Sequence, residues 1–357
     1  MHLEKRYLEL CRKDAKAQRK PGLMQSAIYF VAPLRLCAFA AGVMLEICLA
    51  CGASPASAQS YPEKPVRMIV AYAAGGNADL LARVVGQKLG ESLQQQIIID
   101  NRAGANGVIG TDLVAKAAPD GYTLAFIASG HAINPGMYAK LPFDPLRDFA
   151  PVCQTSSTPI LIAVTAALPA KNIKDLVALA KARPGDMSYA SQGNGSPGHL
   201  AGALFNSLNG ISIVHIPYKS TAQAITDLTS GQVQLMYPSA TTIIPHVRAG
   251  RLRAIAIATR QRSALAPEIP TASESGLAGF EAGIWNGILA PAHTPPAIVE
   301  RLHAAVAKII QSPDTRERIL GMGADPAIST PAEFGTLIAA EIKKWSKVIK
   351  ESGAKLD

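Results

Sequence analysis

The chain has 357 residues, of which 48% are hydrophobic and 17% charged, and its formal net charge is +9. This length is enough for about two domains of ordinary size with substantial cores. The positive charge does not indicate a nucleic-acid-binding protein, because the Lys and Arg residues beyond position 58 form no basic block.

The first 58 residues have the features of a cleavable secretory signal peptide. A basic region (1–35) precedes a ten-residue apolar run (36–45), and the small-residue sequence ASA (56–58) ends the segment. The apolar run is too short to cross a bilayer. Because the basic region is unusually long, a start at Met24 would leave a more conventional signal. We therefore expect export to the periplasm and cleavage after residue 58.

Removal of residues 1–58 changes the charge and the cysteine content. Eight Lys/Arg and four Asp/Glu residues are lost, so the net charge falls from +9 to +5. A mildly positive protein suits a small anionic ligand through its long-range field. Four of the five cysteines are lost as well, and Cys153 remains. We therefore expect neither an internal disulfide nor a cysteine-based metal site.

Beyond residue 58, apolar runs alternate with amphipathic patterns of helical period. The expected strands are 66–72, 96–100, 122–129, 160–166, 211–216, 233–237 and 252–259, and the expected helices are 80–89, 108–118, 173–183, 221–231, 295–312 and 331–352. Asn172, with Asp175 three residues later, is a candidate N-cap for the third helix. The alternation predicts parallel βαβ units and an α/β class. No polar linker divides the chain, which favours two domains joined by several crossings.

Two turns of small residues lie where a short apolar run leads into a helical pattern. The first contains Gly75, Gly76, Asn77 and Asp79, and the second contains Ser191, Gly193, Asn194, Gly195, Ser196 and His199. Ser196 followed by Pro197 predicts an N-cap and the first helical residue. Helix N-termini offer unpaired N–H groups and partial positive charge, and glycine lets the backbone approach a ligand closely. The turns therefore predict two halves of an anion site or two ordinary capped turns, and spacing alone leaves both open.

Two residues of these turns have alternative interpretations. A carboxylate would repel an anion, so Asp79 is expected to stabilise the helix start or pair with Arg83, although it could also accept a hydrogen bond from a ligand. His199 follows Ser196 by three residues. A Ser–His catalytic dyad is conceivable there, but a histidine packed at the helix start is favoured.

Other chemical signatures are weak. The sequence GNGSPG (193–198) does not match the G-x-S-x-G motif of hydrolases. The histidines beyond residue 58 form no H-x-x-x-H metal pair. The glycines of 102–110 have the spacing G-x-x-G-x-x-G rather than that of a dinucleotide loop, and we interpret this stretch as a turn into a helix. We therefore expect no catalytic residues, no metal and no cofactor.

Taken together, collinear stretches covering roughly residues 61–357 resemble the periplasmic solute-binding receptors of tripartite tricarboxylate transporters, the Bug receptors. The matching stretches include YPEKPVRMIV, GGNAD, DNRAGANGVIG, AAPDGYTL, HAINPGMY, SQGNGSPGHLAGALF, VHIPYKS and KKWSKVIKESGAKLD. The sequence departs from the family pattern at Ala74, Ser220 and 238–242, which puts the ligand's identity in doubt more than the fold.

The resemblance implies a type II periplasmic-binding-protein fold, in which two α/β domains hold a ligand in the cleft between them. Domain 1 would comprise 59–157 and 260–357, and domain 2 would comprise 158–259. Carried onto this chain, the ligand motifs are Tyr72 to Asp79 and Ser191 to His199, and Ser129, at the end of an expected strand, is added to the ligand-binding candidates.

The sequence thus predicts a receptor, not an enzyme, that captures a small organic carboxylate in the periplasm. It is expected to be a monomer, to deliver the ligand to membrane transporter subunits or a sensor protein, and to bind no nucleic acid. Two alternatives stay open. One is a sensing receptor for an amide or an aromatic acid without a dedicated transporter, and the other is a hydrolase using Ser196 and His199.

Overall fold

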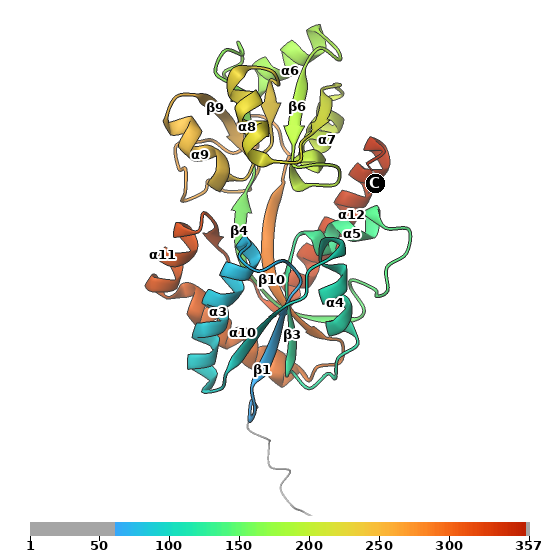
Figure 1. Cartoon of the computed structure of the whole chain (residues 1–357), viewed down its shortest axis with the longest axis vertical. Coiled ribbons are helices and arrows are strands. Elements are labelled where there is room, and N and C mark those ends of the chain that lie inside the picture. The colour runs from blue at the N-terminus through green and yellow to red at the C-terminus, as the bar shows by residue number, and fades with distance from the viewer. Residues whose placement is uncertain (1–60, 355–357) are drawn as a thin grey trace, which may run out of the picture. The chain divides into compact units, whose positions relative to one another are not determined.

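A computed structural model describes residues 61–354 of the chain. The expected signal peptide and its cleavage point lie outside the described residues. Within 61–354, the strands form one six-stranded and one five-stranded sheet, each flanked by helices, and we call the parts built on them the first and second lobes (Figure 1). None of the helices in this range combines the length and apolar character that crossing a bilayer requires.

The first sheet has the order β11-β4-β10-β3-β1-β2. Its strands are β1 (Val66–Val70), β2 (Ile97–Asn101), β3 (Thr123–Ala128), β4 (Phe149–Pro159), β10 (Gly283–Pro291) and β11 (Asp325–Pro326). Strand β1 runs parallel to β2 and β3, whereas β10 is antiparallel to both β3 and β4. The second sheet has the order β7-β6-β8-β5-β9. Its strands are β5 (Leu161–Thr165), β6 (Ser188–Ser191), β7 (Val214–Pro217), β8 (Leu235–Met236) and β9 (Leu252–Ile257).

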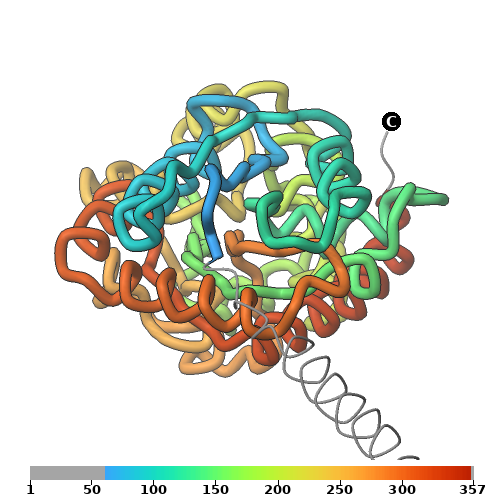
Figure 2. The backbone as a smooth tube through the Cα atoms, turned by 90° about the horizontal axis from the view of Figure 1, so that it is seen from below, coloured from blue at the N-terminus to red at the C-terminus, as the bar shows by residue number. Residues whose placement is uncertain are grey.

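The helices cover both faces of each sheet. They are α3 (Asn77–Leu93), the short 3-10 turn η1 (Ala105–Gly107), α4 (Val108–Ala115), α5 (Gly130–Met137), α6 (Ile173–Ala182), α7 (Pro197–Asn209), α8 (Thr221–Ser230), α9 (Ala240–Arg248), α10 (Pro296–Gln311), α11 (Pro313–Gly321) and α12 (Pro331–Ser352). In Figure 2 the C-terminal helices, orange to red, run along one side of the described part, and the blue first strand lies near its centre.

Strand β1 shows how the sequence builds these layers. Successive side chains of a strand point to opposite faces of the sheet. Met68 and Val70 accordingly join the apolar cluster that contains Leu81 of α3, whereas Ile69 joins the cluster that contains Phe334 of α12. All three strand residues are fully buried, as expected for a sheet covered on both faces.

The predicted helix starts are confirmed at particular residues. Helix α6 begins after Asn172, whose side chain accepts the backbone N–H of Asp175 at 2.9 Å. Helix α12 occupies 331–352 as expected, and Thr330 and Glu333 form a reciprocal capping box at its start.

The expected parallel βαβ units are present, since α3 connects the parallel strands β1 and β2 and α7 connects the parallel strands β6 and β7, but both sheets also contain antiparallel strands. Strands β4 and β10, which the sequence analysis did not predict, pair antiparallel over Phe149–Pro159 and Gly283–Pro291. Strand β5 likewise pairs antiparallel with β8 and β9. The physical reason is the repeated crossing between lobes: β4 leads directly into β5, and β10 brings the chain back (Figure 1). The division into domains at 157/158 and 259/260 stays a prediction.

Strand β10 approaches its neighbours most closely at Gly287. A Cβ placed there would lie 2.2 Å from Cζ of Phe334 and 2.8 Å from the carbonyl oxygen of Cys153. The register of β10 against β4 also shifts between Asn286 and Gly287. Only a residue without a side chain fits at this point, where α12 packs onto the crossing strands.

Buried His131 on α5 makes stability depend on pH. Its ring stacks on Phe143, its Nε2 lies 2.9 Å from the carbonyl oxygen of Pro145, and it is 2% exposed. Burial lowers the pKa of His131 to about 4 from its ordinary value of 6.5. The folded state therefore binds fewer protons than the unfolded state between these values, so stability is full above pH 6.5 and falls as the pH drops towards 4.

We expect His131 to remove about 2 kcal/mol from the free energy of unfolding between pH 7.5 and pH 5. Urea unfolding of the wild type and of His131→Gln, whose amide can still donate to the Pro145 carbonyl, checks this. The wild type should lose about 2 kcal/mol more than the variant over this interval. An equal loss in both proteins would show that His131 does not carry the effect.

Candidate functional site

The first small-residue turn connects β1 to α3 and is organised around Asp79. Gly75 has a φ of 80° and Gly76 is the N-cap of α3. The buried Asp79 carboxylate accepts hydrogen bonds from the Gly75 amide at 2.8 Å, from Arg83 Nε at 3.0 Å and from Asn101 Nδ2 at 2.9 Å. The predicted pairing with Arg83 is thus confirmed.

The electrostatics of Asp79 follow from the same contacts. Burial by itself raises the pKa of this carboxyl, but the hydrogen bonds from Arg83, Gly75 and Asn101 outweigh burial and lower the pKa. Asp79 therefore stays ionised at neutral pH and holds the glycine turn in shape.

The second turn connects β6 to α7 and is held by its own hydrogen bonds. The Gly193 amide donates to Ser191 Oγ at 3.1 Å, and the Gly195 amide donates to His199 Nδ1 at 3.0 Å. Ser196 is the N-cap of α7, as predicted, and its hydroxyl accepts the backbone N–H of His199 at 3.3 Å. Gly193 and Gly195 have φ values of 107° and 71°, so the turn needs glycine at both positions.

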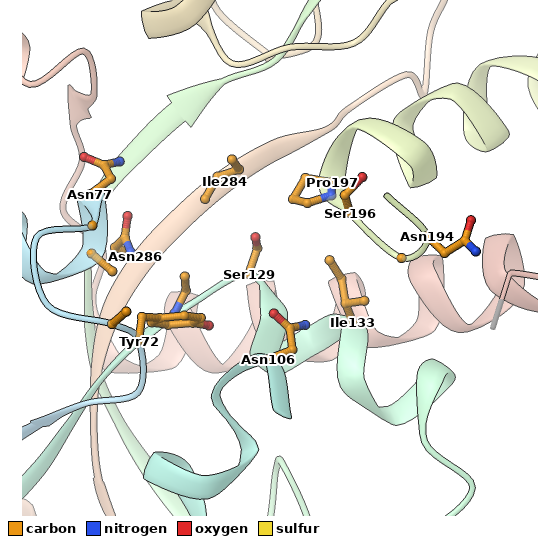
Figure 3. A pocket seen from close by; sticks show the side chains of 16 residues that line it. Tyr72, Asn77, Asn106, Ser129, Ile133, Asn194, Ser196, Pro197, Ile284 and Asn286 are labelled. Atoms are coloured by element: carbon orange, nitrogen blue, oxygen red, sulfur yellow. The ribbon is translucent and has the colours of Figure 1, made fainter. Parts of the chain in front are cut away.

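Both turns contribute to one cavity of about 620 Å³. Figure 3 shows its side chains: Tyr72, Ser129 and Asn106 from the first lobe face Ser196 and Pro197 at the start of α7. The lining residues are Tyr72, Ala73, Gly76, Asn77, Ala78, Asn106, Ala128, Ser129, Gly130, Ile133, Asn194, Gly195, Ser196, Pro197, Ile284 and Asn286. None of these lining residues carries a charged side chain.

The cavity brings together seven of the predicted ligand-binding residues and leaves out five. Those that line it are Tyr72, Gly76, Asn77, Ser129, Asn194, Gly195 and Ser196. Those that do not line it are Gly75, Asp79, Ser191, Gly193 and His199. Gly76 and Gly195, which come from different lobes, thus face the same space.

The backbone N–H groups at the cavity that lack an acceptor within the turns differ from the glycine amides that the sequence analysis expected to bind the ligand. The amides of Gly75, Gly193 and Gly195 already donate to Asp79, Ser191 and His199. By contrast, the N-caps of α3 and α5 make no side-chain cap bond, so the first amides of both helices keep the unpaired character of a helix start. Asn77 and Ala78 of α3 and Gly130 of α5 line the cavity. These two helix starts give the cavity its positive end without any cationic side chain.

Four of the larger side chains that line the cavity were not singled out from the sequence, namely Asn106, Ile133, Ile284 and Asn286. Asn106 lies in the glycine stretch interpreted as a turn, and its φ of 51° belongs to a run of positive φ values from Gly104 to Gly107. Its amide donates to Asn134 Oδ1 at 2.9 Å, which ties η1 to α5. Ile284 and Asn286 lie on β10, which the sequence analysis did not identify as a strand.

Tyr72 lines the part of the cavity that the first lobe forms. Its hydroxyl accepts the Ala128 backbone N–H at 3.3 Å, and a Cβ at Gly107 or Gly130 would come within 3.2 Å of that hydroxyl. Burial raises the pKa of Tyr72 to about 12, so its hydroxyl stays protonated at neutral pH.

The Ser196–His199 dyad does not form in the described residues. The Ser196 hydroxyl accepts a backbone N–H, and His199 Nδ1 accepts the Gly195 amide. The His199 ring instead stacks on His215, with ring centroids 3.8 Å apart. This is the packed histidine that the sequence favoured. Within the same residues, no group of three or more His, Cys, Asp or Glu side chains could hold a metal ion.

Two α/β lobes with an uncharged cavity lined from both sides are the architecture of a periplasmic solute-binding protein. The periplasmic binding protein BugD has a solved structure that is 33% identical to this chain, covers 83% of it and 100% of BugD, and superposes with a TM-score of 0.64. The predicted fold class is therefore confirmed.

The chain belongs to the tripartite tricarboxylate transporter family of receptors, whose profile, "Tripartite tricarboxylate transporter family receptor", matches residues 81–354. It is 38% identical to protein BugT of Bordetella pertussis over 306 residues, which span 85% of this chain and 94% of BugT. A Rhodopseudomonas palustris protein solved with adipate is 34% identical, covers 83% of this chain and 100% of its own, and has a TM-score of 0.67.

Proposed function

We propose that the protein captures a small organic carboxylate in the cavity between the starts of α3, α5 and α7 and delivers it to membrane transporter subunits. In this proposal it acts in the periplasm as a monomer, after removal of the N-terminal segment. Binding requires no covalent chemistry, and closure of the lobes around the ligand would distinguish the loaded from the empty receptor.

One observation carries the proposal: two uncapped helix starts face a cavity whose lining has no charged side chain. A carboxylate placed there would receive N–H donors and the partial positive charge of both helices. The adipate-bound relative supports the same ligand class.

We assign the parts of the cavity different roles. The amides of Asn77, Ala78 and Gly130 would hold the carboxylate, and the absence of a side chain at Gly76 would let it approach α3. The hydroxyls of Ser129 and Ser196 would add donors from either lobe. Ile133 and Ile284 would contact the apolar body of the ligand.

A second candidate is a receptor for an amide or an aromatic acid that signals rather than transports. The observation that favours it is the set of four carboxamides in the lining, Asn77, Asn106, Asn194 and Asn286. Each carboxamide both donates and accepts hydrogen bonds, so the set matches a neutral polar group as well as an anion.

A thermal-shift screen of the purified protein tests the ligand class. Adipate, shorter and longer mono- and dicarboxylates, their amides, and sugar and cationic compounds form the panel. A carboxylate present at 100 times its Kd should stabilise the folded protein by about 2.7 kcal/mol and raise its Tm. The matching amide should give a smaller shift. A shift from cationic or sugar compounds alone would rule out the carboxylate proposal, and a larger shift from the amides would favour the second candidate.

A further inference from the structure

A second cavity, of about 500 Å³, lies behind the second turn. Its lining comes from β6, α7, the segment before β7, β7 itself and the C-terminal end of α12. His199 and His215 both line it, whereas Gly195, which is bonded to His199, lines the first cavity. The second turn therefore separates the two cavities. The two histidines lie on the side of the turn that faces away from the proposed ligand.

The two histidine rings form a tight parallel stack. Their centroids are 3.8 Å apart and the ring planes differ by 3°. Tyr189 of β6 packs beside His215, with ring centroids 5.0 Å apart. His199 is 7% exposed, so water has little access to its ring. A positive charge on the His199 ring would have little solvent around it and would face the half-buried His215 ring directly.

Each ring is hydrogen-bonded to the turn. His199 Nδ1 accepts the Gly195 amide at 3.0 Å, so its ring carries no proton at Nδ1. His215 Nε2 lies 2.6 Å from Ser191 Oγ. The same hydroxyl accepts the Gly193 amide and donates to the Gly193 carbonyl oxygen, both at 3.1 Å. The pair thus supports both ends of the segment Ser191–Gly195.

Protonation of His199 would break its hydrogen bond with the Gly195 amide. A proton on His199 Nδ1 would turn the acceptor of the Gly195 amide into a second donor facing it, which would leave that amide without its partner. Since two like charges at this separation repel strongly, the stack takes up one proton far more readily than two.

We propose that the stacked pair His199–His215 positions the second turn for ligand binding only while His199 carries no proton at Nδ1, so that acidification weakens ligand binding. His199 and His215 act here as positioning residues, since they reach the ligand only through the turn. The proposal rests on the proposed function for its binding readout.

The surroundings of the pair favour the neutral form at neutral pH. Burial lowers the pKa of His199, and burial followed by the proximity of His199 lowers the pKa of His215 to about 4. The ionisable groups that share the second cavity are Tyr189 and Glu351. Glu351, on α12, is half exposed and paired with Lys347 and the Ser207 hydroxyl.

The test combines a readout that needs no ligand with one that does. In the 15N-labelled protein, the amide resonance of Gly195 is followed from pH 8 to pH 4 together with the imidazole resonances of both histidines. Adipate affinity is measured by calorimetry over the same range. We expect the Gly195 resonance to move with the protonation of His199. Below that midpoint, adipate affinity should fall about tenfold per pH unit.

Three variants separate positioning from a general structural role. In His199→Asn the side-chain oxygen can take the place of Nδ1 as acceptor and does not titrate, so affinity should stay near the wild-type value at pH 8 and lose most of its pH dependence. His199→Leu offers no acceptor and should bind weakly at every pH. His303→Asn is the control, because His303 contacts Ser329 outside both cavities and its loss should leave the wild-type profile.

Several outcomes would overturn the proposal. One is a Gly195 resonance that stays fixed while His199 protonates. Another is a pH profile of adipate binding that is the same in the wild type and in His199→Asn. Failure of adipate to bind at pH 8 would count against the proposed ligand class alone, because the Gly195 titration still decides the role of the pair.

Discussion

The variant Gly76→Leu is expected to lose at least about 100-fold in carboxylate affinity, which corresponds to about 2.7 kcal/mol, while remaining folded. Gly76 is the N-cap of α3 with φ −77° and ψ 166°, an extended conformation that any residue adopts. A Cβ there would meet only the Ala73 carbonyl oxygen, at 3.3 Å. A leucine side chain would therefore occupy the cavity in front of the uncapped amides without positive-φ strain, and the Ala73 carbonyl would need to shift by only a few tenths of an ångström.

The measurement is calorimetric binding of the best carboxylate from the screen, with Tm recorded for each protein. Gly321→Leu is the matched control, because a Cβ at Gly321 meets nothing within 4 Å and this residue does not line the cavity. Gly195 is a poorer test position, since its φ of 71° strains any other residue. Wild-type affinity in Gly76→Leu would show that the ligand binds elsewhere.

The variant Gly287→Val is expected to lose about 3 kcal/mol or more of its free energy of unfolding, at the upper end of the range for overpacked cores. The Phe334 ring and the Cys153 carbonyl already occupy the space around this residue, and the carbonyl belongs to the β4 backbone, which cannot rotate away. For a domain of this size the loss corresponds to a fall in Tm of about 10 °C. Urea unfolding and thermal melts measure both quantities.

Gly283→Ala on the same strand is the control, because its nearest neighbour would be 3.6 Å from the new Cβ. It should cost less than about 1 kcal/mol. The double variant Gly287→Ala, Phe334→Leu should recover part of the unfolding free energy that Gly287→Ala loses. Leucine at position 334 is smaller than phenylalanine and leaves room for the new Cβ at position 287. Equal stability of Gly287→Val and Gly283→Ala would contradict the packing described for β10.

Local signals were sufficient to predict many elements of the fold. The helix at 331–352 has a clear apolar stripe and begins with a capping box, so its bounds follow from nearby residues alone. Strand β4 lacked such a signal, because its sequence, FAPVCQTSSTP, mixes polar residues and prolines and is buried through tertiary contacts, which include pairing with β10 and β11 and packing of α10 and α12. The antiparallel strands depend on which lobe the chain enters next, and no short window of sequence contains that information.

The residues of the candidate site also fall into two groups, those that the local sequence predicts and those that only the tertiary fold brings to the cavity. Gly76, Asn77, Asn194, Gly195 and Ser196 were predicted because they follow strands and open helices, a pattern that is visible locally. Ile284 and Asn286 come from β10 and reach the cavity only through the tertiary fold. The glycine amides illustrate a further limit, because a sequence shows which amides a turn contains but not which side chains, such as Asp79, already bind them.

Cys153 lies on β4, one of the strands that cross between the lobes. This thiol is fully buried on β4, opposite Ile288 of β10, and burial raises its pKa to about 12. The other four cysteines of the chain lie at positions 11, 37, 48 and 51, outside the described residues. A protein lacking that segment would carry a single thiol that alkylating reagents reach only when the strands crossing between the lobes come apart. The alkylation rate would then report how often the core of the first lobe opens around β4 and β10, without any engineered probe.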